Sequence, residues 1–157
     1  MGNLEEIEAI KRLKSKYFRN LDTKSWDELE QCFTKDATTS YYSGMFSHQG
    51  VDDIMKFLSE VVGPPTTMHH GHNPEIDIIS DNTATGIWRL EDYVIVHDFN
   101  MSMHGSAIYH DEYVKVNGEW KIKHTGFDRV FEETWDRADA PSLKLTHDMW
   151  GHITEST

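Results

Sequence analysis

Residues 106–129 read SAIYHDEYVKVNGEWKIKHTGFDR and give the clearest indication of secondary structure in the chain. Two alternating runs flank the dipeptide Asn117-Gly118. Asn-Gly is typical of a two-residue hairpin turn, because both turn positions need a left-handed backbone. The stretch therefore predicts a hairpin in which residues 106–116 pair with residues 119–129.

Strands also precede this hairpin, because the same period of two recurs upstream. The strands expected from this period are Ala37–Tyr42, Met45–Gly50, Thr66–His72, Glu75–Ser80, Thr83–Val96, Ser102–Val116 and Glu119–Phe131. Asp81-Asn82 and Ser43-Gly44 supply further turns between them.

Helices are expected before the strands. Three- and four-residue spacing of apolar side chains predicts a first helix of about five turns, with Leu4, Ile7, Ile10, Leu13, Tyr17 and Leu21 on one face. Asn3 with Glu6 is typical of a capping box, and Ser25 with Glu28 repeats the signal for a second helix reaching Phe33. A third helix is predicted over Val51–Val62, ended by Gly63-Pro64-Pro65.

Helices followed by antiparallel strands indicate the α+β class. The length of 157 residues, without a linker or repeat, fits one domain over residues 1–157, with residues 132–157 as a C-terminal tail. A curved sheet wrapped over the helices would leave a cavity between the layers, which is a usual place for a ligand site.

Composition narrows the function classes. Fifteen Lys and Arg against 27 Asp and Glu give a net charge of -12, which disfavours nucleic acid and anionic membrane surfaces as partners. Cys32 is the single cysteine, so no intrachain disulfide can form, and we expect it to be a small core residue. The sequence has neither a signal-peptide pattern nor an apolar run of membrane-spanning length, so we expect a cytoplasmic protein.

The stretch Ala84–Asp92 places a carboxylate where a core should be apolar. One face carries Trp88 and Leu90 and ends in Asp92. A carboxylate on an apolar face needs hydrogen bonds or a raised pKa, and either property is useful in catalysis. The alternative is that the strand has reached solvent at this point.

Further candidates come from the first helix and the last strands. Tyr17 is either a core tyrosine or a phenol that lines the cavity, and Asp22 is either a turn carboxylate or the orienting partner of a histidine. Tyr109 belongs to an alternating polar face. Arg129 lies between Phe127 and Phe131, two aromatic residues expected to point inward on the same strand face, and it either caps the sheet or stabilises negative charge in a site.

The segment His69-His70-Gly71-His72 offers two kinds of chemistry. One histidine can serve as a general base without a metal. Alternatively, His70 and His72 share a strand face, and this His-x-His pair followed by Glu75 can bind a metal. We favour the first interpretation and expect no metal in the catalytic site.

Several long stretches carry a family resemblance: IEAIKRLKSKYFRNLDTKSWDELE, TSYYSG, MHHGHNPEI, TATGIWRLED, GSAIYHDEYVKVNGEW and TGFDRVFEE. From Glu5 to Trp150 the chain resembles the SnoaL-like branch of the nuclear transport factor two superfamily and, within it, the bile acid 7α-dehydratases. The resemblance implies a cone-shaped barrel made of a curved, mostly antiparallel sheet, with the pocket inside the cone. It also implies a homo-oligomer, a trimer rather than a dimer.

The resemblance further implies a cofactor-free elimination with an Asp–His dyad and a tyrosine. Motif by motif, the catalytic residues fall on Tyr17, Asp22, His69, Asp92 and Arg129, and a further site tyrosine falls on Tyr41. We expect Tyr41, Trp88 and Tyr109 to bind the substrate. His70 remains the alternative to His69. The implied substrate is a small hydrophobic polycyclic enone, either free or as its coenzyme A thioester.

One segment departs from the family pattern. Residues 96–105, VHDFNMSMHG, are expected at the pocket mouth, so the substrate need not be a bile acid. Three functions fit this reading: a hydro-lyase that dehydrates a steroid-like substrate, an isomerase or polyketide cyclase using the same dyad, and a ligand-binding protein without chemistry.

Overall fold

The computed structural model describes residues 3–153 and has the α+β architecture expected from the sequence. Its helices are α1 (Asn3–Asp22), α2 (Trp26–Glu30), α3 (Val51–Val62) and the short 3-10 helices η1 (His97–Phe99) and η2 (Arg137–Asp139). Its strands are β1 (Phe33–Tyr41), β2 (Phe46–Gln49), β3 (Thr66–Ser80), β4 (Thr83–Val96), β5 (Met101–Val116) and β6 (Glu119–Asp136).

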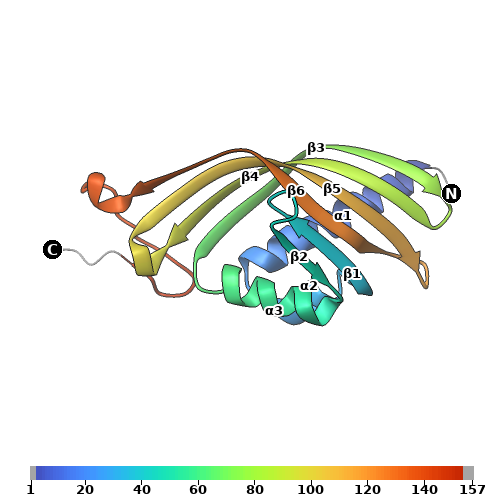
Figure 1. Cartoon of the computed structure of the whole chain (residues 1–157), viewed down its shortest axis with the longest axis horizontal. Helices are drawn as coiled ribbons and strands as arrows, with labels where there is room; N and C mark the ends of the chain where they lie inside the picture. Colours follow the sequence, from blue (N-terminus) through green and yellow to red (C-terminus); the bar gives the residue numbers. More distant parts are fainter. Residues whose placement is uncertain (1–2, 154–157) are drawn as a thin grey trace.

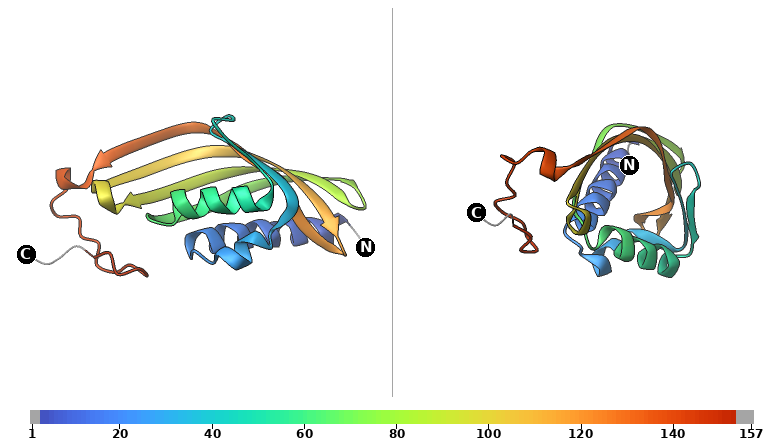
Figure 2. Two further views of the ribbon diagram at one scale, coloured as in Figure 1. Left: turned by 60° about the horizontal axis from the view of Figure 1, so that its bottom comes forward. Right: turned by 60° about the vertical axis from the view of Figure 1, so that its left-hand side comes forward.

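The strands form one mixed sheet in the order β2-β1-β6-β5-β4-β3. All neighbouring strands are antiparallel except β1 and β6, which run parallel. The long strands β3 to β6 arch over α1 and α3 (Figure 1) and curl around them when seen from the end (Figure 2). The core therefore lies between the concave face of the sheet and the helices, where Tyr17, Ile54, Leu90 and Ile122 are buried.

The hairpin predicted around Asn117-Gly118 is confirmed. Val116 pairs with Glu119, and the two turn residues between them have φ angles of 51° and 82°. Both values lie in the left-handed region, which glycine adopts without the steric penalty that other residues meet. The predicted bounds of α3 and β4 are also confirmed.

Several local predictions were wrong. The two segments expected on either side of Asn73-Pro74 form the single strand β3, with a register shift between His72 and Glu75. The second helix ends at Glu30, and Phe33 already begins β1. Ser25 precedes α2 without making a side-chain cap hydrogen bond.

The capping role expected of Glu6 is replaced by long-range contacts. Its carboxylate accepts a hydrogen bond of 2.6 Å from the indole of Trp120 and lies 2.7 Å from the Lys115 ammonium. Both partners come from the β5–β6 hairpin, so Glu6 ties the start of α1 to that hairpin.

The C-terminal tail begins later than expected, because β6 continues to Asp136. Beyond η2, the chain turns back toward η1 and the start of β3 (Figure 1). Asp148 accepts a hydrogen bond from the Thr66 hydroxyl, and the His152 ring stacks on that of His97 with centroids 3.9 Å apart. Residues 154–157 of the predicted tail lie outside the described residues. Within residues 3–153, no helix is both long and apolar enough to cross a membrane.

Candidate active site

A cavity of about 450 Å³ lies between the helices and the concave face of the sheet. Its walls are mainly apolar, with Phe57, Val61 and Phe127 among them. The polar residues of the lining come from α1, β1 and the turn after it, β3, β4, η1, β5 and β6: Tyr17, Tyr41, Tyr42, Thr67, His69, Asp92, Asp98, Tyr109 and Arg129. An apolar cavity with a few convergent polar groups is typical of a small-molecule site.

His69 and Asp22 form a hydrogen-bonded dyad at this cavity. Nδ1 of His69 lies 2.6 Å from Oδ1 of Asp22, and the backbone N–H of His69 donates to Oδ2 at 2.9 Å. Asp22 ends α1 and stands behind His69, off the cavity wall. A carboxylate at Nδ1 fixes the tautomer with its proton on that nitrogen, which leaves Nε2 unprotonated and able to act as a base.

Two residues that the sequence did not single out support the dyad from behind. The Thr67 hydroxyl donates to Oδ1 of Asp22 at 2.8 Å and accepts from the Lys24 ammonium at 3.1 Å. Burial lowers the pKa of Lys24 to about 8, although the charges of Asp22 and Asp148 oppose this shift. Thr67 is visible from the sequence only as the second residue before His69 on the same strand face.

Three buried phenols gather at the cavity. The hydroxyls of Tyr17 and Tyr41 lie 3.3 Å apart, and Tyr109 lines the same space. Burial raises the pKa of all three phenols well above their usual value. They therefore stay protonated near neutral pH and act as hydrogen-bond donors, since phenolate is not accessible there.

Asp92 and Arg129 form a bidentate ion pair beside the dyad, because Asp92 is the register partner of His69 on the neighbouring strand β4. Nη1 and Nη2 of Arg129 donate to the two carboxylate oxygens at 2.6 and 2.7 Å. Burial lowers the pKa of Arg129, but the hydrogen bonds and charge of Asp92 outweigh it and raise the pKa overall. Gly105 permits this geometry, because a Cβ there would lie 2.6 Å from Nη1.

A second carboxylate joins this pair. Tyr42 donates to Glu132 at 2.6 Å and accepts from Nη2 of Arg129 at 3.2 Å, while Nε of Arg129 lies 3.1 Å from Glu132. Arg129 is thus held by two carboxylates, which fixes its position and neutralises its charge.

The structure brings most of the predicted site residues together. Tyr17, Tyr41, His69, Asp92, Tyr109 and Arg129 line the cavity, with Asp22 behind His69. His69 is the histidine that meets Asp22, while His70 is exposed on the other side of the sheet.

Trp88 does not line the cavity, contrary to its predicted role in substrate binding. Its side chain is buried on the inner face, and its indole donates to the Tyr113 hydroxyl at 2.9 Å. The expectation that Phe131 points inward with Phe127 is also wrong. The register shifts between Ser106 and Ala107, which breaks the alternation and leaves Phe131 45% exposed.

A buried ion pair beneath the cavity was missed altogether. The Lys14 ammonium is completely buried, lies 2.7 Å from Asp111 and sits 3.8 Å from the centroid of the Tyr109 ring. Asp111 also accepts from Tyr113 at 2.6 Å and from Thr125 at 2.7 Å. The available signal was the position of Lys14, three residues before Tyr17 on the helix face that points inward.

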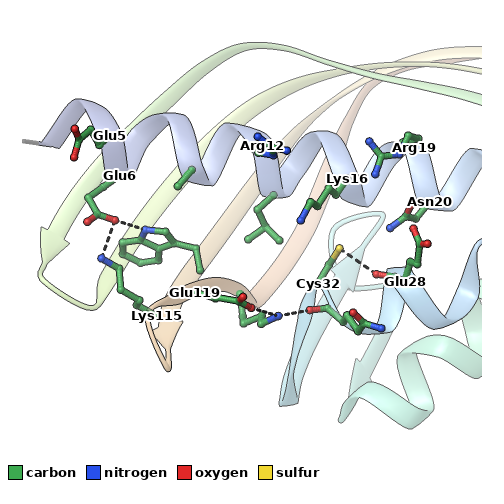
Figure 3. A pocket seen from close by; sticks show the side chains of 16 residues that line it. Glu5, Glu6, Arg12, Lys16, Arg19, Asn20, Glu28, Cys32, Lys115 and Glu119 are labelled. Carbon is green, nitrogen blue, oxygen red and sulfur yellow. Dashed lines mark hydrogen bonds and ion pairs between the residues drawn. The ribbon is translucent and has the colours of Figure 1, made fainter. Parts of the chain in front are cut away.

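A larger hollow of about 960 Å³ lies between α1 and the tip of the β5–β6 hairpin, next to Cys32 (Figure 3). Figure 3 shows Arg12, Lys16 and Arg19 along the helix, with Cys32 and Glu28 below it in the view. Cys32 is buried, as expected, and burial raises the pKa of its thiol. A protonated thiol is a poor nucleophile, so Cys32 does not offer nucleophilic chemistry at this hollow.

Comparison with known proteins agrees with this geometry. A model of the SnoaL-like domain matches residues 2–126. The chain belongs to the SnoaL-like family. The structure of a protein from Novosphingobium aromaticivorans, provisionally described as a scytalone dehydratase, is similar to this SnoaL-like chain at 30% identity and a TM-score of 0.78. The match covers 85% of this chain and 89% of that one.

More distant structures share the fold of this SnoaL-like protein. A hexachlorocyclohexane dehydrochlorinase from Novosphingobium barchaimii is 21% identical, with a TM-score of 0.77 over 85% of this chain and 92% of that chain. A protein of Kribbella flavida is 16% identical, with the same TM-score over 84% of this chain and 95% of that chain. These similarities confirm the predicted cone-type α+β fold.

Proposed function

We propose that this SnoaL-like protein is a cofactor-independent dehydratase that eliminates water from a hydroxylated, steroid-like or otherwise polycyclic enone. The observation that carries the proposal is the 2.6 Å contact between His69 Nδ1 and Asp22 at the wall of an apolar cavity. The dyad supplies a base, and the buried phenols beside it supply hydrogen bonds without a cofactor.

In this mechanism, Nε2 of His69 removes the acidic γ-proton of the enone, from the carbon next to the one that carries the hydroxyl, and a dienolate forms. Asp22 stabilises the imidazolium that results. Tyr17 and Tyr41 donate hydrogen bonds to the carbonyl oxygen as negative charge develops on it. The proton held by His69 then passes to the leaving hydroxyl, so one water is released and His69 returns to its neutral form.

Asp92 and Arg129 act as a positioning pair. Asp92 is one of the predicted catalytic residues, but both of its oxygens accept from Arg129. A carboxylate held in a bidentate pair is a weak base and carries no proton to donate. The pair instead fixes the part of the sheet beside the dyad and orients the ring system of the substrate.

The cavity favours a rigid apolar substrate in its free form. A volume of about 450 Å³ lies in the range of small-molecule pockets and suits several fused rings. Among the described residues of its lining, Arg129 is the only lysine or arginine, and it is already paired with Asp92. Asp98 adds negative charge at the lining. The phosphates of a coenzyme A thioester would therefore find little attraction there, which favours the free acid.

Isomerisation is the second candidate, because the Tyr17–Tyr41 pair would stabilise the same enolate in either reaction. Mass spectrometry of the product separates the two reactions, since dehydration lowers the mass by one water and isomerisation conserves it.

The first substrates to test are a 7α-hydroxy-3-oxo-Δ4 bile acid and its coenzyme A thioester. Loss of water from either supports the proposal, and an unchanged product mass would replace it with isomerisation. If no substrate of a hydroxylated polycyclic panel is turned over, ligand binding without chemistry becomes the better interpretation.

A further inference from the structure

The convex side of the sheet carries a cluster of imidazole and carboxylate groups away from the cavity. His70 and His72 project from β3 and Glu91 from β4, and His70 pairs directly with Glu91 in the sheet register. One ligand atom of each residue lies within 4.8 Å of the other two. The side chains of His72 and Glu91 are 44% and 47% exposed, so an ion can reach them from solvent.

The spacing of these atoms suits a tetrahedral cation. Bonds of about 2.0–2.1 Å place neighbouring ligand atoms of a zinc site roughly 3.3 Å apart. Nε2 of His72 lies 3.5 Å from Oε2 of Glu91. The rings of His70 and His72 are inclined at 77° with centroids 5.7 Å apart, so their nitrogens can approach one point from different directions.

A fourth group lies on the next strand. Nε2 of His104, from β5, is 3.3 Å from Oε1 of Glu91. The other ring nitrogen of His104 lies 3.5 Å from Glu133, the kind of outer carboxylate that orients a metal-binding histidine. Arg89, which pairs with His72 in the register, opposes a cation, whereas the net charge of -12 favours one.

A second cluster, His97, Asp148 and His152, has equally close ligand atoms but poorer geometry. The ring planes of His97 and His152 are inclined by only 18°, so their nitrogen lone pairs lie nearly parallel and do not converge on one ion. The Asp148 oxygens already accept from Thr66 and from the backbone N–H groups of Trp150 and His152. This cluster is satisfied without an ion.

We propose that His70, His72 and Glu91 bind one Zn²⁺ on the convex face, with His104 as an additional ligand. Two imidazoles and a carboxylate suit zinc better than the oxygen-preferring Mg²⁺ or Ca²⁺. The sequence pattern suggested Glu75 as the carboxylate, but the register shift pairs Glu75 with Ile87, and Glu91 takes its place. The ion ties the edge strand β3 to its neighbours and takes no part in the elimination.

The test uses the full-length, untagged protein stripped with EDTA and titrated with Zn²⁺ by calorimetry, together with thermal unfolding. We expect one Zn²⁺ per chain and a Tm that rises with Zn²⁺ concentration, because the ion binds only the folded state. His72→Ala and Glu91→Gln should each weaken binding by at least about tenfold, as expected for loss of a ligand. His110→Ala is the matched control, since His110 is exposed on β5 and lies near Asp128.

Unchanged Tm values in EDTA establish that the variants fold. The proposal is overturned if the wild type binds no zinc, if both ligand variants bind as tightly as wild type, or if His110→Ala loses affinity to the same extent. Loss of binding only in His152→Ala would assign the ion to the other cluster. None of these results depends on turnover, so they are distinct from failure of the dehydratase proposal.

Discussion

Asp22 holds His69 through two contacts. The ring nitrogen Nδ1 of His69 lies 2.6 Å from the Asp22 carboxylate, and the backbone N–H of His69 donates to the same carboxylate at 2.9 Å. The residue therefore has both its ring and its main chain fixed against the end of α1. A base positioned in this way loses little freedom when the substrate binds, which is a recognised source of catalytic efficiency.

Replacing Asp22 with Asn should remove the charge that stabilises the imidazolium while keeping the shape of the side chain. We expect kcat to fall by about 10²–10⁴-fold, the usual contribution of acid–base groups. Asp27→Asn, on the exposed side of α2, is the matched control and should keep the wild-type rate. Equal rates in the two variants would show that the dyad is structural.

Tyr17→Phe should lower turnover far more than it lowers stability. The change removes a hydroxyl that lies 3.3 Å from that of Tyr41, and one hydrogen bond contributes only about 1 kcal/mol to folding. Chemical denaturation and steady-state kinetics on the same preparations measure both effects. Tyr93→Phe serves as the control, because Tyr93 bonds Ser102 outside the cavity lining. A Tyr17→Phe enzyme with undiminished kcat would remove the phenol from the mechanism.

Lys14→Met should destabilise the fold strongly, because it leaves Asp111 buried without its cation. Removing one partner of a buried pair typically costs about 3–5 kcal/mol. Adding Asp111→Leu to the same chain should restore part of that loss, since no buried charge then remains. Lys11→Met, at a half-exposed pair with Glu8, should change stability by less than about 1 kcal/mol. The denaturant midpoints of wild type, the two single variants and the double variant measure these differences in stability. Equal midpoints for Lys14→Met and Lys11→Met would contradict the prediction.

Acid should release the C-terminal tail. Burial and the neighbouring His152 lower the pKa of His97 below 6.5, so the docked state holds it neutral and loses stability as pH falls below that value. Burial raises the pKa of Asp148, but hydrogen bonds from Thr66, Trp150 and His152 outweigh it and lower the pKa to about 2. The Asp148 contribution is therefore complete above about pH 4 and is lost as pH falls toward 2.

Hydrogen exchange of residues 140–153 between pH 7 and 3 measures this release. Protection should decrease with pH in the wild type and be low already at pH 7 in Asp148→Asn. Protection that stays constant over the whole range in both proteins would mean that these contacts do not hold the tail.

Local features of the fold could be predicted from sequence because they depend on neighbouring residues. Asn117-Gly118 specifies its own turn, and the apolar spacing of Val51–Val62 specifies α3. The orientation of Phe131 could not be predicted, because the register shift at Ser106–Ala107 depends on how two strands meet.

The candidate site depends mainly on contacts between residues that are far apart in the sequence, which spacing alone does not predict. No spacing in the sequence places Asp22 beside His69, 47 residues later, and only the family resemblance indicated this pair. Lys14 and Asp111 were missed for the same reason, since the two residues meet only after the sheet has closed over α1.

The most direct test of the dyad compares the rate of water loss in wild type and in His69→Gln, with product mass followed in single-turnover experiments. His110→Gln, a change at an exposed histidine, is the control. If His69 is the base, the His69→Gln enzyme should bind substrate yet form the dehydrated product at least about 100-fold more slowly, while the control matches wild type. Dehydration by His69→Gln at the wild-type rate would contradict the proposed mechanism.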